Sequence, residues 1–280
     1  MKFFKYHALG NDYIVLRAED GADKLSSAQV VRICHRNFGV GSDGILLYQG
    51  RRSDGLFPLR IFNPDGSEAE KSGNGLRIFS RFLWDRGEVS DAPFGVSTPG
   101  GEVECQVSEA GQKVTVEMGS VSFSSTKIPV SGAEREVLRE KITVDGVELE
   151  FNAATVGNPH CVILRKKALA EEAKRFGPLL EVEHRFPNRT NVQFMEILDR
   201  HNIKIEIWER GAGYTLASGS SSSASAAVAY RLGLCDGEIT VHMPGGTLEI
   251  KVQPDFQILM SGGVTRVADG EFYDEMLNWR

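Results

Sequence analysis

The chain has 280 residues, 41% of them hydrophobic and 25% charged, which is the balance of a soluble globular protein with one large or two modest domains. Its net charge of −6 and the lack of a basic run argue against a nucleic-acid partner. No apolar stretch approaches the roughly 20 residues of a membrane span, and the first residues lack a signal peptide's apolar region, so we expect a cytoplasmic protein with no membrane partner.

The predicted elements follow the same order twice along the chain. In the first half we expect a turn at residues 10–11, a helix at 26–38 and strands at 45–48 and 61–63. A second helix is expected at 72–87 and a hairpin turn at 98–101. The second half contains the same elements at residues 157–158, 168–180, 192–195, 207–209, 218–233 and 243–246. In both halves the second helix starts at a Ser-Gly pair and stops at a glycine, the usual residue after a helix C-terminus.

The two halves also share short sequence matches at a nearly constant offset of 145 to 147 residues. The matched pairs are Asn11 with Asn158, Asn63 with Glu209, Ser72 with Ser218, and Gly101 with Gly246. Since four matches in one order at one offset rarely arise by chance, we interpret the chain as an internal duplication. The predicted fold is α+β, with two pseudo-symmetric halves, each a curved, mostly antiparallel sheet around a central helix.

The boundaries of the halves follow from these matches. We expect an N-terminal half over residues 1–119 and a C-terminal half over residues 120–263. Residues 120–147 are polar and weakly periodic, so we predict that they connect the halves and lie outside the core. Residues 264–280 have no counterpart in the first half, and we expect them to complete the N-terminal half.

The two Ser-Gly pairs, Ser72-Gly73 and Ser218-Gly219, stand where helices are predicted to begin. Unpaired backbone N–H groups and the positive end of the helix dipole meet there, and such a place binds a carboxylate. Two of them predict one small acid held from both sides, with the serine hydroxyls alongside. The next residues, Asn74 and Ser220, are expected to contact the same acid.

Further polar candidates stand at equivalent places of the two halves. Asn11 and Asn158 follow glycines, where a turn residue and a ligand contact are both open interpretations. Asn63 and Glu209 end matching strands, and the latter is followed by Arg210, whose guanidinium matches a carboxylate.

His160 is the one histidine beside a candidate site. It is either a hydrogen-bonded structural residue or the partner of Glu209 in proton transfer. The other histidines have no metal-ligand spacing, and the cysteines are far apart, as reduced thiols in a cytoplasm would be. We therefore expect no metal site.

Taken together, these motifs resemble the diaminopimelate epimerase family of cofactor-independent amino-acid racemases and epimerases. The resemblance covers nearly the whole chain through residues 5–12, 38–44, 60–68, 72–75, 157–160, 189–191, 209–213 and 244–246. It implies two halves that each supply a cysteine, one taking the α-proton and the other returning a proton on the opposite face, without pyridoxal phosphate or metal. The substrate contacts that it implies are Asn11, Asn63, Asn158, His160, Asn191, Glu209 and Arg210.

The sequence departs from this family where the chemistry is expected. The two catalytic cysteines fall on Ser72 and Ser218, whose hydroxyls are far weaker acids than a thiol of pKa near 8.5. Loss of one tuned acid or base lowers a rate on the order of 10²–10⁴-fold. Tyr214 stands where the family usually has Glu, and Gly44 where some members have Gln. Because Tyr214 and residues 220–223 also deviate, we favour a natural branch over engineered serines.

Three hypotheses for function follow. The first is a diaminopimelate epimerase-like isomerase that inverts an amino-acid α-carbon, with Ser72, Ser218, His160 and Glu209 as catalytic groups. The second is a divergent member, an isomerase or dehydratase in which Glu209 alone transfers a proton. The third is a non-catalytic amino-acid-binding protein. In each case the partner is a small amino acid, and a homodimer is expected.

Overall fold

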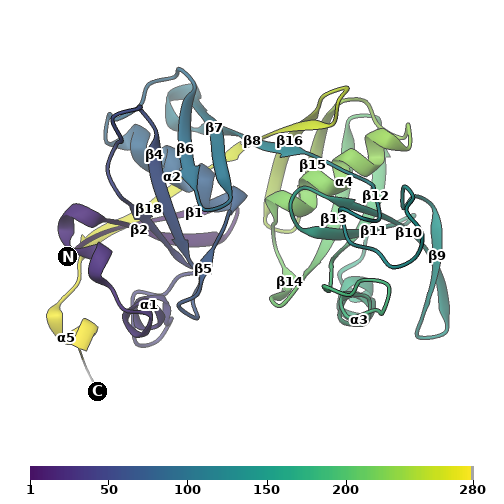
Figure 1. Ribbon diagram of the computed structural model, residues 1–280, viewed down its shortest axis with the longest axis horizontal. Coiled ribbons are helices and arrows are strands. Elements are labelled where there is room, and N and C mark those ends of the chain that lie inside the picture. Colours follow the sequence, from purple (N-terminus) through teal and green to yellow (C-terminus); the bar gives the residue numbers. More distant parts are fainter. Residues whose placement is uncertain (279–280) are drawn as a thin grey trace. The chain divides into compact units, whose positions relative to one another are not determined.

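The computed structural model describes residues 1–278, which form two compact units (Figure 1). Unit 1 comprises Met1–Val116 and the segment from Gly262 onward, and unit 2 comprises Glu117–Ser261. The chain passes from unit 1 to unit 2 within β8 (Lys113–Ser120) and returns within β17 (Gln257–Gly263). Of the segment 264–280, residues 279–280 lie outside the described residues.

Unit 1 is a mixed sheet with a long helix, α2 (Gly73–Asp85), and two short ones, α1 (Ser27–Cys34) and α5 (Asp274–Asn278). Its strands are β1 (Lys2–Ala8), β2 (Asn11–Arg17), β3 (Ile45–Tyr48), β4 (Phe57–Phe62), β5 (Glu68–Ala69), β6 (Phe94–Thr98), β7 (Gly101–Ser108) and β18 (Thr265–Glu271). They pair in the order β18–β1–β2–β3–β4–β6–β7–β8, with β5 beside β4. The β2/β3 and β4/β6 pairs are parallel, and the others are antiparallel.

Unit 2 repeats this connectivity around α4 (Gly219–Arg231), with α3 (Ala170–Glu181) in the place of α1. Its strands are β9 (Glu140–Val144), β10 (Val147–Thr155), β11 (Pro159–Leu164), β12 (Asn191–Asp199), β13 (Asn202–Glu209), β14 (Gly213–Thr215), β15 (Glu238–Met243) and β16 (Gly246–Val252). They pair in the order β9–β10–β11–β12–β13–β15–β16–β17, with β14 beside β13. The β11/β12 and β13/β15 pairs are parallel.

The duplication extends to strand register. In unit 1 Ile14 pairs with Ile45, and in unit 2 Cys161 pairs with Val192, so both partners shift by 147 residues. The prediction of an α+β fold with two similar halves is thereby confirmed.

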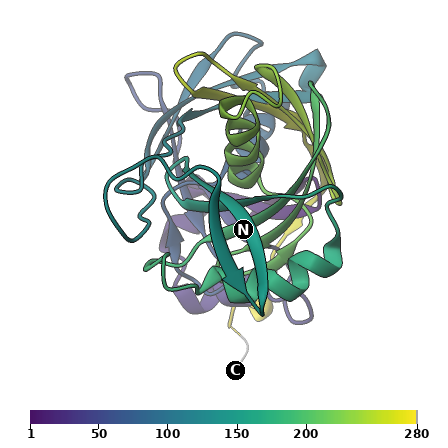
Figure 2. The ribbon, with the colours of Figure 1, turned by 90° about the vertical axis from the view of Figure 1, so that its right-hand side faces the viewer.

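The central helices are buried because their own sequences are small or apolar. Helix α4 contacts strands β10, β11, β12, β13, β15 and β16, and the strands of unit 2 surround it in Figure 2. Its alanines leave room for the sheet on every side. The hydroxyls of Ser222 and Ser223 donate 2.8 Å hydrogen bonds to the carbonyls of Ser218 and Gly219, which lets serines lie inside a dry core.

Both central helices end in the same way. In α2 the N–H of Gly87 bonds the carbonyl of Trp84 and that of Glu88 bonds Leu83, and Gly87 has φ +70°. Helix α4 ends with an identical pattern at Gly233, also at φ +70°. These are Schellman motifs, and they confirm the predicted helix ends.

The other helices differ from prediction at their ends. Helix α1 was expected over 26–38 but stops at Cys34, because the next residue, His35, is extended and its ring Nδ1 accepts hydrogen bonds from the N–H groups of Asn37 and Phe38. Helix α3 lies within two residues of the expected 168–180.

The prediction that residues 120–147 lie outside the core is wrong. Val130, Val137, Ile142 and Val144 are buried in one hydrophobic cluster with Phe151 of β10. The serines that made this segment look like a linker bond its own backbone, as the Ser125 hydroxyl does with Arg135 and Ala133. Residues 140–144 form a strand of the sheet of unit 2. Within residues 1–278, no helix is long and apolar enough to cross a membrane.

Candidate active site

The start of α2 carries the first half of the predicted site. Ser72 is its N-cap, in extended conformation, and its hydroxyl accepts a 3.1 Å hydrogen bond from the N–H of Gly75. Gly73 and Asn74 form the first turn, and Asn74 is buried. A serine N-cap leaves other N–H groups of the first turn directed away from the helix, which is the arrangement that binds an anion.

The Ser72 hydroxyl also contacts a second hydroxyl. The phenol oxygen of Tyr13, on β2, lies 3.3 Å from Ser72 Oγ, and either atom can be the donor. The bond from Gly75 uses one lone pair of Ser72 Oγ, which leaves the hydroxyl its own proton to donate and a second lone pair to accept from Tyr13.

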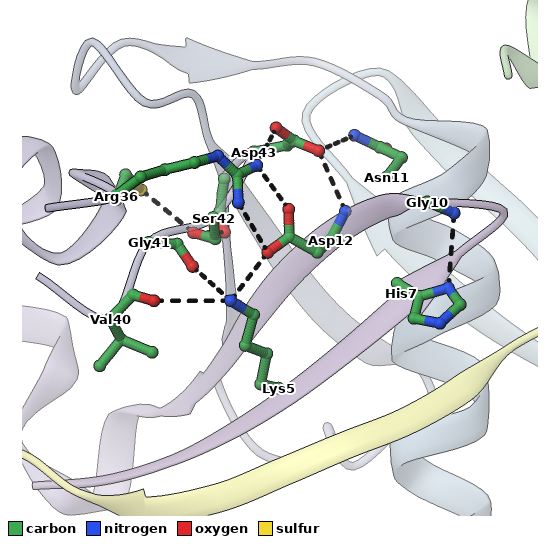
Figure 3. Close-up of polar contacts among 12 residues, drawn as sticks. Lys5, His7, Gly10, Asn11, Asp12, Arg36, Val40, Gly41, Ser42 and Asp43 are labelled. Atoms are coloured by element: carbon green, nitrogen blue, oxygen red, sulfur yellow. Dashed lines mark hydrogen bonds and ion pairs between the residues drawn. The ribbon is translucent and has the colours of Figure 1, made fainter. Parts of the chain in front are cut away.

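Asn11 is held by a network of charges at the start of β2 (Figure 3). Arg36 donates 2.7 Å hydrogen bonds to the carboxylates of Asp12 and Asp43, and Lys5 lies 2.9 Å from Asp12. Asp43 in turn accepts from the Asn11 amide at 2.9 Å. Burial raises the pKa of Asp12, but the hydrogen bonds from Arg36 and Lys5 outweigh it and hold that pKa below its usual range. The turn is therefore a fixed platform for the Asn11 side chain.

Asn74 connects this platform to α2. Its amide nitrogen donates to Asn11 Oδ1 at 3.1 Å, and its own Oδ1 accepts from Arg77 at 2.6 Å. The structure thus brings three predicted residues of unit 1 together, namely Asn11, Ser72 and Asn74.

The start of α4 carries the second half of the predicted site. Ser218 is the N-cap, and its hydroxyl accepts a 3.4 Å hydrogen bond from the N–H of Ser221. Ser220 Oγ lies 3.5 Å from Ser218 Oγ and accepts from the amide of Asn158 at 3.4 Å. The same two positions are joined at the start of α2, but with donor and acceptor exchanged: Asn74 donates to Asn11 there, whereas Ser220 accepts from Asn158.

Glu209 ends β13 and faces Ser218. Burial raises the pKa of its carboxyl, and a hydrogen bond from the Ser218 hydroxyl offsets part of that rise. A carboxylate whose pKa is raised binds a proton more firmly, which makes it a stronger general base. Unit 2 therefore places an ionisable group directly beside its serine.

His160 is fully buried, and its ring Nε2 lies 3.0 Å from Asn158 Oδ1. Desolvation lowers the pKa of His160 to about 3, so the ring is neutral. Its Nδ1 and the Oε1 of the neighbouring Gln193 have no partner among the described residues. The structure therefore favours the interpretation of His160 as a structural residue that orients Asn158.

The other predicted contacts are spread over turns and strand ends. Asn191 donates to the carbonyl of Pro159 and accepts from the N–H of Arg210, both at 3.0 Å. The Arg210 guanidinium is exposed and donates to the carbonyl of Asn188 at 2.9 Å. Asn63 bonds the hydroxyl of Ser67 at 2.9 Å across a tight turn.

No cysteine of the chain can replace the two missing thiols. Burial raises the pKa of each thiol, to about 12 for Cys105. All four are free and buried; they are Cys34, Cys105, Cys161 and Cys235. Within residues 1–278, no group of three or more His, Cys, Asp or Glu side chains could hold a metal ion.

Tyr13 and Gln193 are the site residues that the sequence analysis missed. The repeat could have found Tyr13, because it stands 147 residues before His160, the same offset that relates Asn11 to Asn158. Tyr214, singled out in the sequence, donates instead to Glu206 at 2.6 Å, and burial raises its pKa to about 12.

The family model of diaminopimelate epimerase matches residues 3–124 and 152–267 of the chain. "Diaminopimelate epimerase 2" of Nostoc sp. is 59% identical over 276 residues, covering 99% of this chain and 97% of that protein. A diaminopimelate epimerase of Caldanaerobacter subterraneus subsp. tengcongensis is 38% identical, covering 97% of this chain and 99% of that protein.

Solved structures show the same fold at low sequence identity. A phenazine biosynthesis protein of the PhzF family from Bacillus anthracis has a TM-score of 0.69 at 19% identity, covering 98% of this chain and 99% of that one. A hydroxyproline epimerase from Agrobacterium vitis has a TM-score of 0.69 at 15% identity, covering 96% and 90%. With the family model and the curated relatives in agreement over nearly the whole length, this chain belongs to the diaminopimelate epimerase family.

Proposed function

We propose that this protein is a cofactor-independent isomerase that inverts the α-carbon of diaminopimelate, interconverting its LL and meso forms in lysine biosynthesis. The observation that carries the proposal is the pair of serine N-caps. Ser72 and Ser218 begin equivalent buried helices, at equivalent places of two halves with the same strand connectivity. Family membership and the names of the relatives support the substrate.

In this proposal the helix starts hold the α-carboxylate. The N–H groups of the first turns, at Gly73 and Asn74 in α2 and at Gly219 and Ser220 in α4, point away from the helices and carry the positive ends of their dipoles. A carboxylate held in this way also stabilises negative charge that spreads from the α-carbon when its proton leaves.

Proton transfer then proceeds through the serine hydroxyls rather than through thiolates. As Ser218 Oγ takes the α-proton, its own proton passes to the Glu209 carboxylate, so that no free alkoxide forms. The electron pair of the C–H bond stays on the α-carbon and is shared with the carboxylate. The opposite face receives a proton from the Ser72 side, and the α-carbon inverts.

The distal end of diaminopimelate carries a second carboxylate and ammonium group. Arg210 uses one N–H on Asn188 and retains others for a distal carboxylate. We place Asn63, Asn158 and Asn191 around the same end, where their amides can accept from an ammonium group.

Hydrogen–deuterium exchange tests this function. Incubation of LL- and meso-diaminopimelate with the protein in D₂O should put deuterium at the α-carbon and interconvert the forms, as followed by NMR and chiral chromatography. Ser218→Ala should lower the rate at least tenfold. Ser223→Ala is the matched control, since that buried serine of α4 bonds a carbonyl of its own helix. Absence of both exchange and inversion in the unaltered protein would refute the proposal.

The cellular setting is part of the proposal. Four unpaired thiols are what a reducing cytoplasm maintains. The homodimer expected from the sequence stays a prediction.

A further inference from the structure

Each half of this protein places an ionisable side chain beside its serine, but the two side chains differ. In unit 2 it is the Glu209 carboxylate beside Ser218. In unit 1 the repeat counterpart of Glu209 is Asn63, which cannot ionise and bonds Ser67. The group beside Ser72 is instead the phenol of Tyr13, at 3.3 Å.

The site around Tyr13 is shaped for its ring. The ring is 7% exposed, and β2 and β3 run parallel beside it, tied by the N–H of Ile14 to the carbonyl of Gly44 at 3.1 Å. A Cβ at Gly44 would stand 2.7 Å from Tyr13 Cε1 and 2.6 Å from the carbonyl oxygen of Phe62. The ring therefore fills the space that a side chain at position 44 would need.

The counterpart of Tyr13 in unit 2 points to a different role. That counterpart is His160, whose ring bonds Asn158. Tyr13 instead contacts the serine of its own helix start. The two counterparts therefore have different contacts: Tyr13 lies against the serine hydroxyl, and His160 lies against an asparagine.

Chemistry explains why a phenol would suit this place. Tyrosine has an ordinary pKa of about 10 and a thiol about 8.5, whereas an aliphatic hydroxyl does not ionise in this range. Of the groups beside Ser72, the phenol is the closest in acidity to a thiol.

We propose that Tyr13 is the acid–base partner of Ser72, passing a proton to or from the α-carbon through the Ser72 hydroxyl. This rests on the proposed isomerase function and extends it. When Glu209 and Ser218 have removed the α-proton, Ser72 gives its proton to the opposite face of the carbanion and the Tyr13 phenol replaces it. One C–H bond breaks and one forms, the phenol becomes a phenolate and the carboxylate a carboxylic acid, and solvent returns the proton from Glu209 to Tyr13.

The two faces of the substrate are therefore not equivalent for this enzyme. In the direction written above, the Glu209 carboxylate receives a proton and the Tyr13 phenol supplies one, and in the reverse direction these roles are exchanged. A variant that lacks one partner should still exchange the proton that the other removes, without completing inversion.

The test measures α-deuterium exchange and inversion separately, starting from LL- and from meso-diaminopimelate in D₂O. In Tyr13→Phe the rate of inversion should fall at least 30-fold. The epimer whose α-proton is removed by Ser218 should still exchange that proton for deuterium without inverting. Glu209→Gln should show the opposite epimer preference. Tyr48→Phe is the matched control, since that phenol is equally buried in unit 1 and bonds Glu88 instead; it should match the unaltered protein.

A second measurement distinguishes proton transfer from packing. Replacement of Tyr13 by a fluorotyrosine keeps the ring shape and makes the phenol more acidic. In a plot of inversion rate against pH, the alkaline limb should therefore move to lower pH. An unmoved limb, or a Tyr13→Phe variant that inverts within threefold of the unaltered protein, would overturn the role of Tyr13 while leaving the isomerase function intact. If the unaltered protein neither exchanges nor inverts, the proposed function fails and this proposal fails with it.

Discussion

Arg77 donates a 2.6 Å hydrogen bond to Oδ1 of Asn74 from a fully buried position on α2. This bond fixes the orientation of the Asn74 amide, so that its NH₂ group points to Asn11. Burial lowers the pKa of Arg77 to about 10, and its Nε has no partner among residues 1–278. A buried cation with an unpaired nitrogen destabilises the fold, so we infer that its value lies in orienting Asn74.

Arg77→Met should therefore separate stability from activity. Loss of the buried charge should stabilise the fold, and loss of the Asn74 hydrogen bond should destabilise it. The free energy of unfolding should therefore change by less than about 1.5 kcal/mol. The exchange rate should fall about tenfold, because Asn74 is free to turn away from Asn11. Urea denaturation and α-deuterium exchange measure the two quantities.

Arg81→Met is the control for this variant, since Arg81 lies one turn further on α2 and pairs with Asp85. It should exchange at the unaltered rate. An Arg77→Met protein that exchanges normally would show that Arg77 does not orient Asn74.

His160 should make the protein sensitive to acid. The ordinary pKa of about 6.5 applies to the unfolded chain, and burial lowers the folded value to about 3. The unfolded state therefore binds the extra proton in this range, so the stability contribution is complete above about pH 6.5 and is lost as pH falls toward 3. His160→Gln should flatten the decline of unfolding free energy between these values, which urea titrations at several pH values would show.

His184→Gln is the comparison, because that side chain is 85% exposed. It should leave the acid dependence unchanged. If His160→Gln keeps the full slope, another group governs the acid sensitivity.

The sequence was informative wherever local chemistry decides the structure. Neighbours within a few residues determine the serine N-caps of α2 and α4, the glycines that end these helices, and the hairpins. Each of these patterns also occurs in both halves, which strengthens its prediction. It was misleading at 120–147, because serines that bond a nearby backbone look the same in a sequence as serines in a linker.

Contacts between distant elements could not be predicted from spacing. Tyr13 and Ser72 are 59 residues apart and meet only because β2 packs against α2. The burial of His160 likewise depends on α4 and β12 together, so its neutral state could not be inferred from Asn158 and Pro159 beside it. The catalytic roles predicted for Ser72, Ser218, His160 and Glu209 stay predictions.

Gly44→Ala should destabilise unit 1 and disturb Tyr13. The new Cβ would stand 2.7 Å from the Tyr13 ring and 2.6 Å from a backbone oxygen, and the backbone cannot easily yield. Overpacking of this kind should lower the free energy of unfolding by about 1–3 kcal/mol. Since the ring must move, the inversion rate should fall as well. Gly263→Ala is the control, since its new Cβ would stand 3.6 Å from the carbonyl oxygen of Gln112, an ordinary van der Waals contact. An equal loss of stability there would contradict this explanation.

Ser72→Cys with Ser218→Cys should raise the inversion rate. A thiol at a helix N-terminus has a lowered pKa and forms the thiolate that the serines cannot supply, so a gain of about 10²–10⁴-fold is expected for the double variant and a smaller gain for each single one. Alkylation provides an internal check, because the four native thiols are buried. Iodoacetamide should abolish the gain in the double variant and leave the unaltered protein active. A double variant that inverts no faster than the serine form would show that residues 72 and 218 do not carry out the proton transfers of the proposed function.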